Sequence, residues 1–329
     1  MSNARDRSQA GFSLIELLIS TGILLIITSV VTSGLLQMTR SQRTISNRTD
    51  MHSGVRSATE LLQQEVGQAG RITVPAPITL SAAVIEDDTT AILSSVAGLF
   101  VNELLSIEGA DPAIFNNQPE TVQITAIDTS TRQITVKHVS SRGVVTDRFQ
   151  SKHSAGVAVT AAGGFGTGVV PPAPPTGTFT NGSTGSVLKL YGDINGDGNM
   201  VYVEYVCDTT NGALYRNMVA WNAASKPALT PANILLSNIL ANPAQTVGGP
   251  NLPCFQYQMD LFGNYVLDVA ITLTVQTQQI DPVTRQFQRE TKALLNVSPR
   301  NTIGAWQSAG VNQNRVQPMP DTIKNNLLP

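Results

Sequence analysis

One stretch of the sequence has the spacing of oxygen ligands that a calcium ion requires. Asp193, Asn195 and Asp197 alternate ahead of Gly198, and Glu204 completes the pattern D-x-[DN]-x-[DN]-G-x5-E. Oxygens at every second position converge on one cation when such a loop coils, and glycine permits the sharp turn. Asn-Gly and Asp-Gly are also typical of hairpin turns without a metal. The sequence therefore leaves two interpretations, a calcium site or an ordinary hairpin loop.

The segments that flank this loop are predicted strands rather than helices. If a strand begins near Met200, Glu204 lies roughly 13–17 Å beyond the loop, at about 3.3 Å per residue. Glu204 could not then supply the last calcium ligand. Calcium is the single cofactor that the sequence suggests, and the sequence does not make it certain.

The cysteines and histidines are few and widely spaced. Cys207 and Cys254 could form a disulfide if this part of the chain lies outside the cytoplasm, or they could be two separate buried thiols. A bridge closing that loop would stabilise the fold by roughly 4 kcal/mol in the chain-entropy model. His52, His138 and His153 have no spacing typical of a zinc cluster or a Cys-His nucleophile pair. We therefore predict that the protein is not an enzyme.

Composition limits the classes of partner. Charged residues make up 13% of the 329 residues, and the net charge is -2. A nucleic-acid-binding surface usually requires a basic excess, so we predict no nucleic-acid partner. A core can form, but the surface must be rich in uncharged polar side chains.

An apolar run near the N-terminus contains one charge. Residues 12–36 include Glu16 as their single charged residue, and at about 1.5 Å per residue such a helix reaches roughly 37 Å, enough to cross a bilayer core. A secretory signal peptide would need a small-residue cleavage site after the run, and residues 31–33 are a poor one. A permanent plain anchor is the other simple interpretation. A carboxylate inside an apolar run is usually functional.

The residues around the start of this run resemble a known signature. Residues 11–16 read GFSLIE after a short polar leader, MSNARDRSQAG. This combination resembles the prepilin signature of type IV pilins and type II secretion pseudopilins. The resemblance implies cleavage between Gly11 and Phe12, N-methylation of Phe12, and a mature chain of 318 residues (329 − 11). One departure is the absence of a proline within the run, where major pilins usually carry one.

The resemblance gives Glu16 a role in assembly. The amine created at Phe12 can pair with Glu16 of a neighbouring subunit, which neutralises two buried charges together and fixes the register between subunits. The implied partners are other pilin or pseudopilin subunits, the prepilin peptidase, the inner-membrane assembly platform and the lipid bilayer. The implied location is the inner membrane, crossed once with the head outside the cytoplasm, and then the pilus or pseudopilus.

Helical spacing continues beyond the apolar run. Apolar residues recur at steps of three and four from residue 51 to residue 66, and Gly70 and Pro75 then end the pattern. We predict one transmembrane and spine helix over residues 12–69, whose second half is amphipathic and packs on the head. The segment LLQQEVGQAG resembles the end of this helix in PilW-like minor pilins.

The rest of the chain predicts an α+β fold with an antiparallel head. After the leader (1–11) and the helix (12–69), we expect a β-rich subdomain (70–161), a Gly/Pro/Thr-rich linker or exposed loop (162–186), the antiparallel β-sheet of the head (187–300) and an irregular C-terminal tail (301–329). Predicted strands of the subdomain include residues 104–107, 121–127, 133–139 and 157–160. Those of the head include residues 187–191, 201–207, 214–221 and a long hairpin at 265–277 and 286–297.

Three functional hypotheses follow. The first is a minor type IV pilin, a structural subunit that primes or caps assembly of a pilus. The second is a minor pseudopilin of a type II secretion system, which shares the leader and the helix. The third is an adhesin or DNA-uptake module carried on a pilus, with the β-rich subdomain as the binding part.

Overall fold

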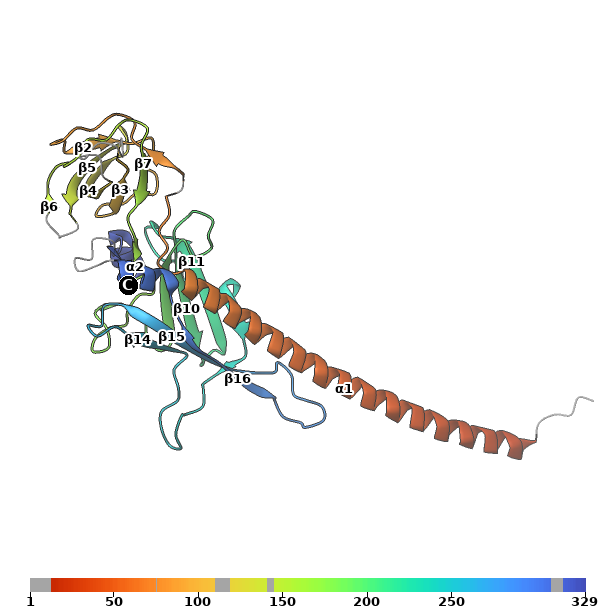
Figure 1. Cartoon of the computed structure of the whole chain (residues 1–329). Helices are drawn as coiled ribbons and strands as arrows, with labels where there is room; N and C mark the ends of the chain where they lie inside the picture. The colour runs from red at the N-terminus through yellow and green to blue at the C-terminus, as the bar shows by residue number, and fades with distance from the viewer. Residues whose placement is uncertain (1–12, 75, 110–118, 141–144, 309–315) are drawn as a thin grey trace, which may run out of the picture. The chain divides into compact units, whose positions relative to one another are not determined.

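The structure, a computed structural model, describes residues 13–74, 76–109, 119–140, 145–308 and 316–329 (Figure 1). A long N-terminal helix, α1 (Leu14–Gln68), is followed by an antiparallel β-rich head, which confirms the predicted α+β class. The predicted leader, residues 1–11, lies outside the described residues. The chain divides into two compact units, and each is described by itself. One comprises the chain up to His52 with Thr277–Gln288, and the other comprises Ser53–Gln276 with Arg289–Pro329.

Helix α1 is continuous because its sequence contains no proline, and it ends at Gln68, two residues before Gly70. Gly70 adopts a φ of +85°, the left-handed conformation that commonly follows the last helical turn. A Cβ at this position would lie 2.6 Å from the carbonyl oxygen of Phe165, so a side chain cannot be accommodated there without a shift of the backbone. The end of the helix is therefore fixed by both local conformation and packing.

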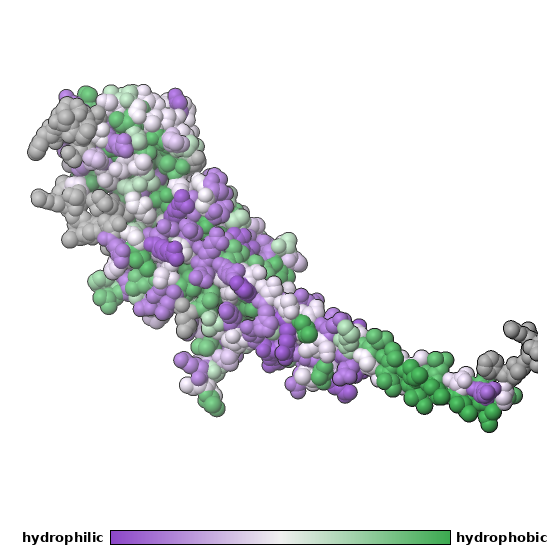
Figure 2. Space-filling view, turned by 45° about the vertical axis from the view of Figure 1, so that its right-hand side comes forward, coloured by the Kyte–Doolittle hydropathy of each residue, from purple (hydrophilic) through white to green (hydrophobic). Residues whose placement is uncertain are grey.

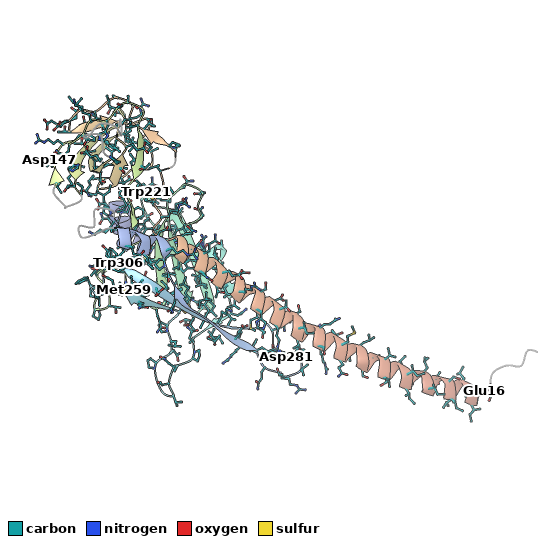
Figure 3. All side chains as sticks on the ribbon, in the orientation of Figure 1. Glu16, Asp147, Trp221, Met259, Asp281 and Trp306 are labelled. Carbon is teal, nitrogen blue, oxygen red and sulfur yellow. A yellow bond between two sulfur atoms is a disulfide. The ribbon has the colours of Figure 1, made fainter. Side chains whose placement is uncertain are left out.

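The first unit holds a loop against the middle of α1. The loop Thr277–Gln288 joins two strands of the head, and its Asp281 accepts a hydrogen bond of 3.0 Å from the Thr44 hydroxyl (Figure 3). The same carboxylate accepts a hydrogen bond of 2.7 Å from the backbone N–H of Val283, and Arg48 donates to the side chain of Gln288. These polar contacts involve the part of α1 that follows the apolar run.

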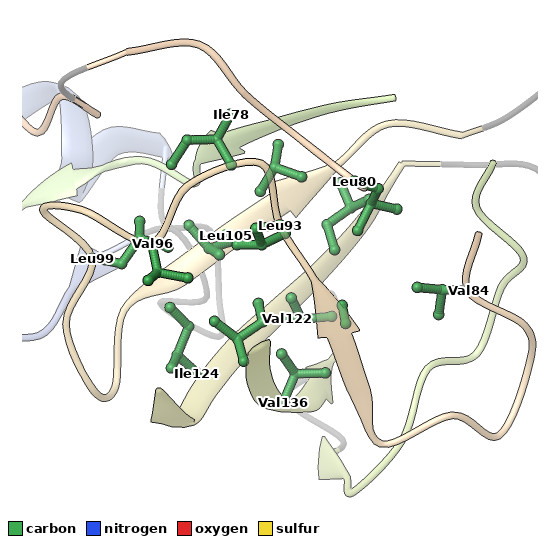
Figure 4. Close-up of a cluster of buried hydrophobic side chains, with 14 of the residues drawn as sticks. Ile78, Leu80, Val84, Leu93, Val96, Leu99, Leu105, Val122, Ile124 and Val136 are labelled. Atoms are coloured by element: carbon green, nitrogen blue, oxygen red, sulfur yellow. The ribbon is translucent and has the colours of Figure 1, made fainter. Parts of the chain in front are cut away.

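The β-rich region that follows α1 forms one sheet with its own core. The strand order is β1-β7-β3-β4-β5-β2, with β6 paired to β5, and every pairing is antiparallel. Figure 4 shows the buried aliphatic side chains that fill this core. The strands are β1 (Ile78–Thr79), β2 (Thr90–Ile92), β3 (Leu104–Ile107), β4 (Glu120–Asp128), β5 (Gln133–Val139), β6 (Val145–Thr146) and β7 (Ala158–Ala161).

The remaining strands form two further antiparallel sheets and a short parallel pair. The orders are β12-β11-β10-β9 and β13-β15-β14, with β16 on the other side of β15, and β17 pairs with β8 in parallel. A one-turn helix, η1 (Pro231–Asn233), precedes β12. The strands are β8 (Gly164–Phe165), β9 (Val187–Gly192), β10 (Val201–Asp208), β11 (Ala213–Ala220), β12 (Ile234–Ser237), β13 (Ile239–Leu240), β14 (Phe255–Met259), β15 (Val266–Gln276), β16 (Arg289–Val297) and β17 (Val316–Gln317).

The last part of α1 contributes to the core of the head, as its sequence periodicity predicts. Val55, Ala58, Leu62 and Val66 are buried, and they recur on one face of the helix. Full burial of such side chains stabilises a fold by roughly 1.5–3 kcal/mol each for the larger ones. The final four turns of α1 are thus held by packing rather than by helix propensity alone.

Two segments differ from the prediction. The segment 162–186, predicted as a linker or exposed loop, contains Phe165, Val169 and Val170, all fully buried. Helix α2 (Arg300–Ser308) begins at the end of the predicted head sheet and occupies the first residues of the predicted irregular tail, 301–329, which also contains the π-helical turn η3 (Ile323–Leu327). Isolated apolar residues in a polar segment give no periodicity, so the sequence alone did not show that tertiary packing buries them.

Candidate functional site: the exposed part of the N-terminal helix

The first part of α1 exposes an extended, largely apolar surface. Its large hydrophobic side chains from Leu14 to Met38 are more than half exposed, and Leu14 is 81% exposed. Figure 2 shows this part of the helix surface as predominantly hydrophobic. The first buried residue of α1 is Val55. An apolar face of this extent requires a bilayer or partner helices to cover it.

The length and the apolar composition of α1 are sufficient for it to cross a membrane. Among the described residues, α1 alone is both long enough and apolar enough. At about 1.5 Å per residue, its apolar part matches the roughly 30 Å core of a bilayer. This feature agrees with a membrane-anchored protein.

Glu16 lies in the first turn of α1 (Figure 3). Its side chain is exposed, and its Oε2 accepts a hydrogen bond of 3.1 Å from the backbone N–H of Ser13. The positive end of the helix dipole favours a carboxylate at this position. The sequence places the charge on an otherwise apolar surface, where a partner cation would be strongly favoured once lipid or neighbouring helices exclude water. Gly11 and Phe12, the predicted cleavage and methylation residues, lie outside the described residues.

Comparison with protein families finds a match that covers this region. The family model described as the prokaryotic N-terminal methylation motif matches residues 6–32. No curated protein and no solved structure matches the chain.

The matched segment contains Gly11, Phe12 and Glu16. The protein therefore carries a type IV pilin-like signature, as the sequence resemblance predicts, and proteins with this signature are typically structural. The motif implies association with other pilin subunits and with the prepilin peptidase in general terms. It also agrees with a membrane-anchored pilin, because the matched residues include the start of an apolar helix long enough to cross a membrane.

The predicted calcium residues lie in the loop between β9 and β10. Asp193 is buried, whereas Asn195 and Asp197 are exposed. The Asn195 amide donates a hydrogen bond of 2.7 Å to Asp197, and the backbone N–H of Asn199 donates one of 2.8 Å to the same carboxylate. Glu204 lies in β10 and accepts hydrogen bonds from the Tyr202 hydroxyl and the Lys226 ammonium group, as expected for a residue that does not belong to the loop.

The structure joins Cys207 and Cys254 in a disulfide, with their Cα atoms 6.5 Å apart. Cys207 lies in β10, and Cys254 immediately precedes β14, so the bridge connects two sheets of the head. By constraining the unfolded chain, it stabilises both sheets together.

A buried ion pair that the sequence analysis missed connects α1 to the head. The Nε atom of Arg216, in β11, lies 3.1 Å and 3.2 Å from the two carboxylate oxygens of Glu65, in α1. The Tyr205 hydroxyl donates a hydrogen bond to the same carboxylate. The Glu65 side chain is 5% exposed and that of Arg216 is 23% exposed. One signal in the sequence could have indicated this contact. Glu65 follows Leu62 by three residues, which places it on the apolar face of the helix.

A crevice of about 670 Å³ lies between the end of α1 and β16. Among the described residues that line it, there is no histidine or cysteine, and the charged groups are Glu60 and Arg300. Amide side chains of Gln63, Gln64 and Gln68 form much of its wall. This lining offers polar contacts, chiefly from amide groups.

Proposed function

We propose that this chain is a minor type IV pilin, a structural subunit that primes or caps assembly of a pilus. The observation that carries the proposal is the methylation signature at residues 6–32, which includes the first part of an exposed apolar helix with Glu16 in its first turn. An exposed apolar helix is suited both to a bilayer and to a bundle of identical helices. The processed subunit would leave the inner membrane for the filament.

The size of the head supports a minor rather than a major subunit. After α1, the chain continues from residue 69 to residue 329, whereas an abundant fibre repeat in this class of protein is usually smaller. The resemblance of LLQQEVGQAG to PilW-like minor pilins points in the same direction. A minor pseudopilin of a type II secretion system, which would share the leader and the helix, is the second candidate.

One observation favours an additional binding role for the head. The sheet built from β1 to β7 has a core of its own (Figure 4), so it is more than an extension of the sheets that pack on α1. This sheet could form an adhesin or DNA-uptake module carried on the pilus. A ligand screen with the full-length protein in detergent would test this role.

Assembly can be tested through Glu16. In Glu16→Ala, the protein should still insert in the membrane, because removal of a carboxylate from an apolar segment favours insertion. Its amount in sheared filaments should fall at least ten-fold relative to the amount in membranes. The matched control is Thr28→Ala, whose hydroxyl bonds only to carbonyl groups of its own helix in the described contacts.

The outcome separates the candidates. Equal incorporation of Glu16→Ala and Thr28→Ala would contradict a registering role for the carboxylate.

Deletion of the gene should abolish or reduce surface pili if the protein is a minor pilin. Normal pili with a loss of secreted proteins would instead identify a pseudopilin.

A further inference from the structure

Asp193 buries a carboxylate that lacks hydrogen bonds. Its side chain is fully buried, and neither carboxylate oxygen accepts a hydrogen bond from a described residue. A buried ionised carboxylate is costly unless it is paired or bound to a metal. Nearly all buried polar side chains in folded proteins have a partner, so an unsatisfied one calls for an explanation such as an ordered water or a bound ion.

Arg71 neutralises this carboxylate incompletely. Its Nε lies 3.7 Å from Oδ2 of Asp193, which is within range of an ion pair but too far for a hydrogen bond. The Arg71 side chain is 46% exposed. Its Nη1 would lie 3.5 Å from a Cβ added at Gly196, so the guanidinium group extends over the loop. The Arg71 guanidinium group thus lies beside Asp193, but it is not placed to donate a hydrogen bond to the carboxylate.

The other oxygens of the loop face solvent. Asp197 is exposed, and its carboxylate accepts a hydrogen bond of 2.8 Å from the backbone N–H of Asn199. Asn195 is also exposed and already contacts Asp197. The loop thus combines a buried carboxylate with an accessible carboxylate and an accessible amide, at the alternating positions of a calcium loop.

We propose that the loop Asp193–Gly198 binds a calcium ion through the side chains of Asp193, Asn195 and Asp197, and that calcium replaces Arg71 as the counter-ion of Asp193. Hard oxygen ligands select calcium, and water completes its coordination. With two carboxylates and without Glu204, the affinity belongs in the range of extracellular modules, a Kd of about 10⁻⁴ to 10⁻³ M.

The position of the loop gives calcium a structural consequence. The backbone N–H of Asp193 donates to the carbonyl of Arg71 at 2.9 Å, and the Thr73 hydroxyl donates to the carbonyl of Gly198 at 3.2 Å. Residues 71–73 are the segment by which the chain leaves α1. A bound ion would therefore stiffen the junction between the spine helix and the strands that follow it.

The test uses the full-length protein in detergent after treatment with a chelator. Calorimetric titration with calcium chloride should give a Kd of about 10⁻⁴ to 10⁻³ M. The melting temperature in 10 mM calcium should exceed that in chelator by about 3–8 °C. Magnesium at the same concentration should give less than half of this rise, because it retains its water and requires a rigid octahedral site.

Variants make the test specific. Asp197→Asn should weaken calcium binding at least ten-fold, and Arg71→Gln should strengthen it several-fold by removing the competing cation. Asp208→Asn is the matched control, because Asp208 also accepts backbone hydrogen bonds in a hairpin turn, between β10 and β11. It should bind calcium as the unmodified protein does.

Three results would overturn the proposal. The first is the absence of a heat of binding together with equal melting temperatures in calcium and in chelator. The second is an equal rise in melting temperature with magnesium, and the third is an equal loss of calcium affinity in Asp197→Asn and Asp208→Asn. Because Asp197 is exposed, its replacement is not expected to prevent folding, so the test does not depend on the buried Asp193.

Discussion

At the scale of single residues, charged groups inside the head determine how α1 is attached. The Glu65 carboxylate is held by Arg216 and Tyr205, which belong to neighbouring strands. Burial is the largest cause that raises the pKa of the Tyr205 hydroxyl, followed by the charge of Glu65. Tyr205 therefore remains a hydrogen-bond donor at neutral pH, and the cluster keeps a fixed pattern of donors and acceptors.

We predict that Arg216→Ala destabilises the full-length protein by about 3–5 kcal/mol, because it leaves the Glu65 charge buried without its partner. Denaturant unfolding in detergent would measure the change. The control is Arg148→Ala, which removes an exposed ion pair with Asp87 and should cost less than about 1 kcal/mol. The double variant Glu65→Leu with Arg216→Leu should recover most of the loss. Equal effects of the two single arginine changes would contradict the anchoring role of Glu65.

A second buried carboxylate makes stability depend on pH. Burial raises the pKa of Glu103 from 4.5 to about 8, although the backbone N–H of Phe100 donates a hydrogen bond to it. Between these two values, the folded protein retains a proton that the unfolded chain releases. The contribution of Glu103 to stability is therefore fully present below pH 4.5 and is lost as the pH rises to about 8.

We accordingly predict that the melting temperature falls between pH 5 and pH 8.5 and that Glu103→Gln reduces this fall. Glutamine cannot ionise and keeps an acceptor for the Phe100 N–H. The control is Glu86→Gln, a change at an exposed carboxylate, which should leave the slope unchanged. Identical slopes for Glu103→Gln and the unmodified protein would show that Glu103 does not titrate in this range.

At the scale of elements, the C-terminal residues belong to the core. Ile323, Leu327 and Leu328 pack in one cluster with aromatic side chains of the head. The carbonyl group of Leu328 accepts a hydrogen bond of 2.6 Å from the Lys189 ammonium group. Residues near the end of the chain therefore contribute directly to the stability of the sheet that contains β9.

We predict that Leu327→Ala destabilises the protein by about 2–5 kcal/mol, the usual cost of a cavity left by a buried leucine. Leu261→Ala is the matched control, because Leu261 is 99% exposed in the turn between β14 and β15. It should change stability by less than about 0.5 kcal/mol. Thermal unfolding of both variants would measure the difference. If Leu327→Ala melted like Leu261→Ala, the C-terminal residues would not be part of the folded core.

At the scale of the whole molecule, the N-terminal signature and α1 together predict how the protein is processed. The predicted cleavage point, between Gly11 and Phe12, precedes the apolar run, so cleavage there would leave the membrane segment in the mature chain. A secretory signal peptide would instead be cut after the run and would release the head. The two possibilities differ in the first residue of the mature protein.

We predict that the mature chain begins at a methylated Phe12. Intact-mass analysis of protein extracted from membranes would establish the start and the methyl group together. The control is the same protein from cells without prepilin peptidase, which should retain Met1 or Ser2 as its first residue. A mature start near Gly34 would contradict the pilin interpretation and restore the signal peptide.

The sequence by itself determined the features that depend on neighbouring residues. The apolar run, its single carboxylate and the helical spacing up to Val66 are local patterns, and they predicted α1 and the signature. Alternating strands such as residues 121–127 and 133–139 lie in β4 and β5 for the same reason. Helices and strands are revealed by periodicity, which requires no knowledge of distant contacts.

Only the tertiary structure decided which polar and isolated apolar residues are buried. Phe165 and Leu327 lie in segments without periodicity, and Glu65 meets Arg216 across 151 residues of chain. Asp193 has the same residue type as Asp197, four positions along the loop, yet one is buried and the other is exposed. Burial is determined by the surfaces that fold against a residue, and these come from distant parts of the chain. A local pattern can therefore indicate the chemistry of a loop, but not whether its carboxylates have partners.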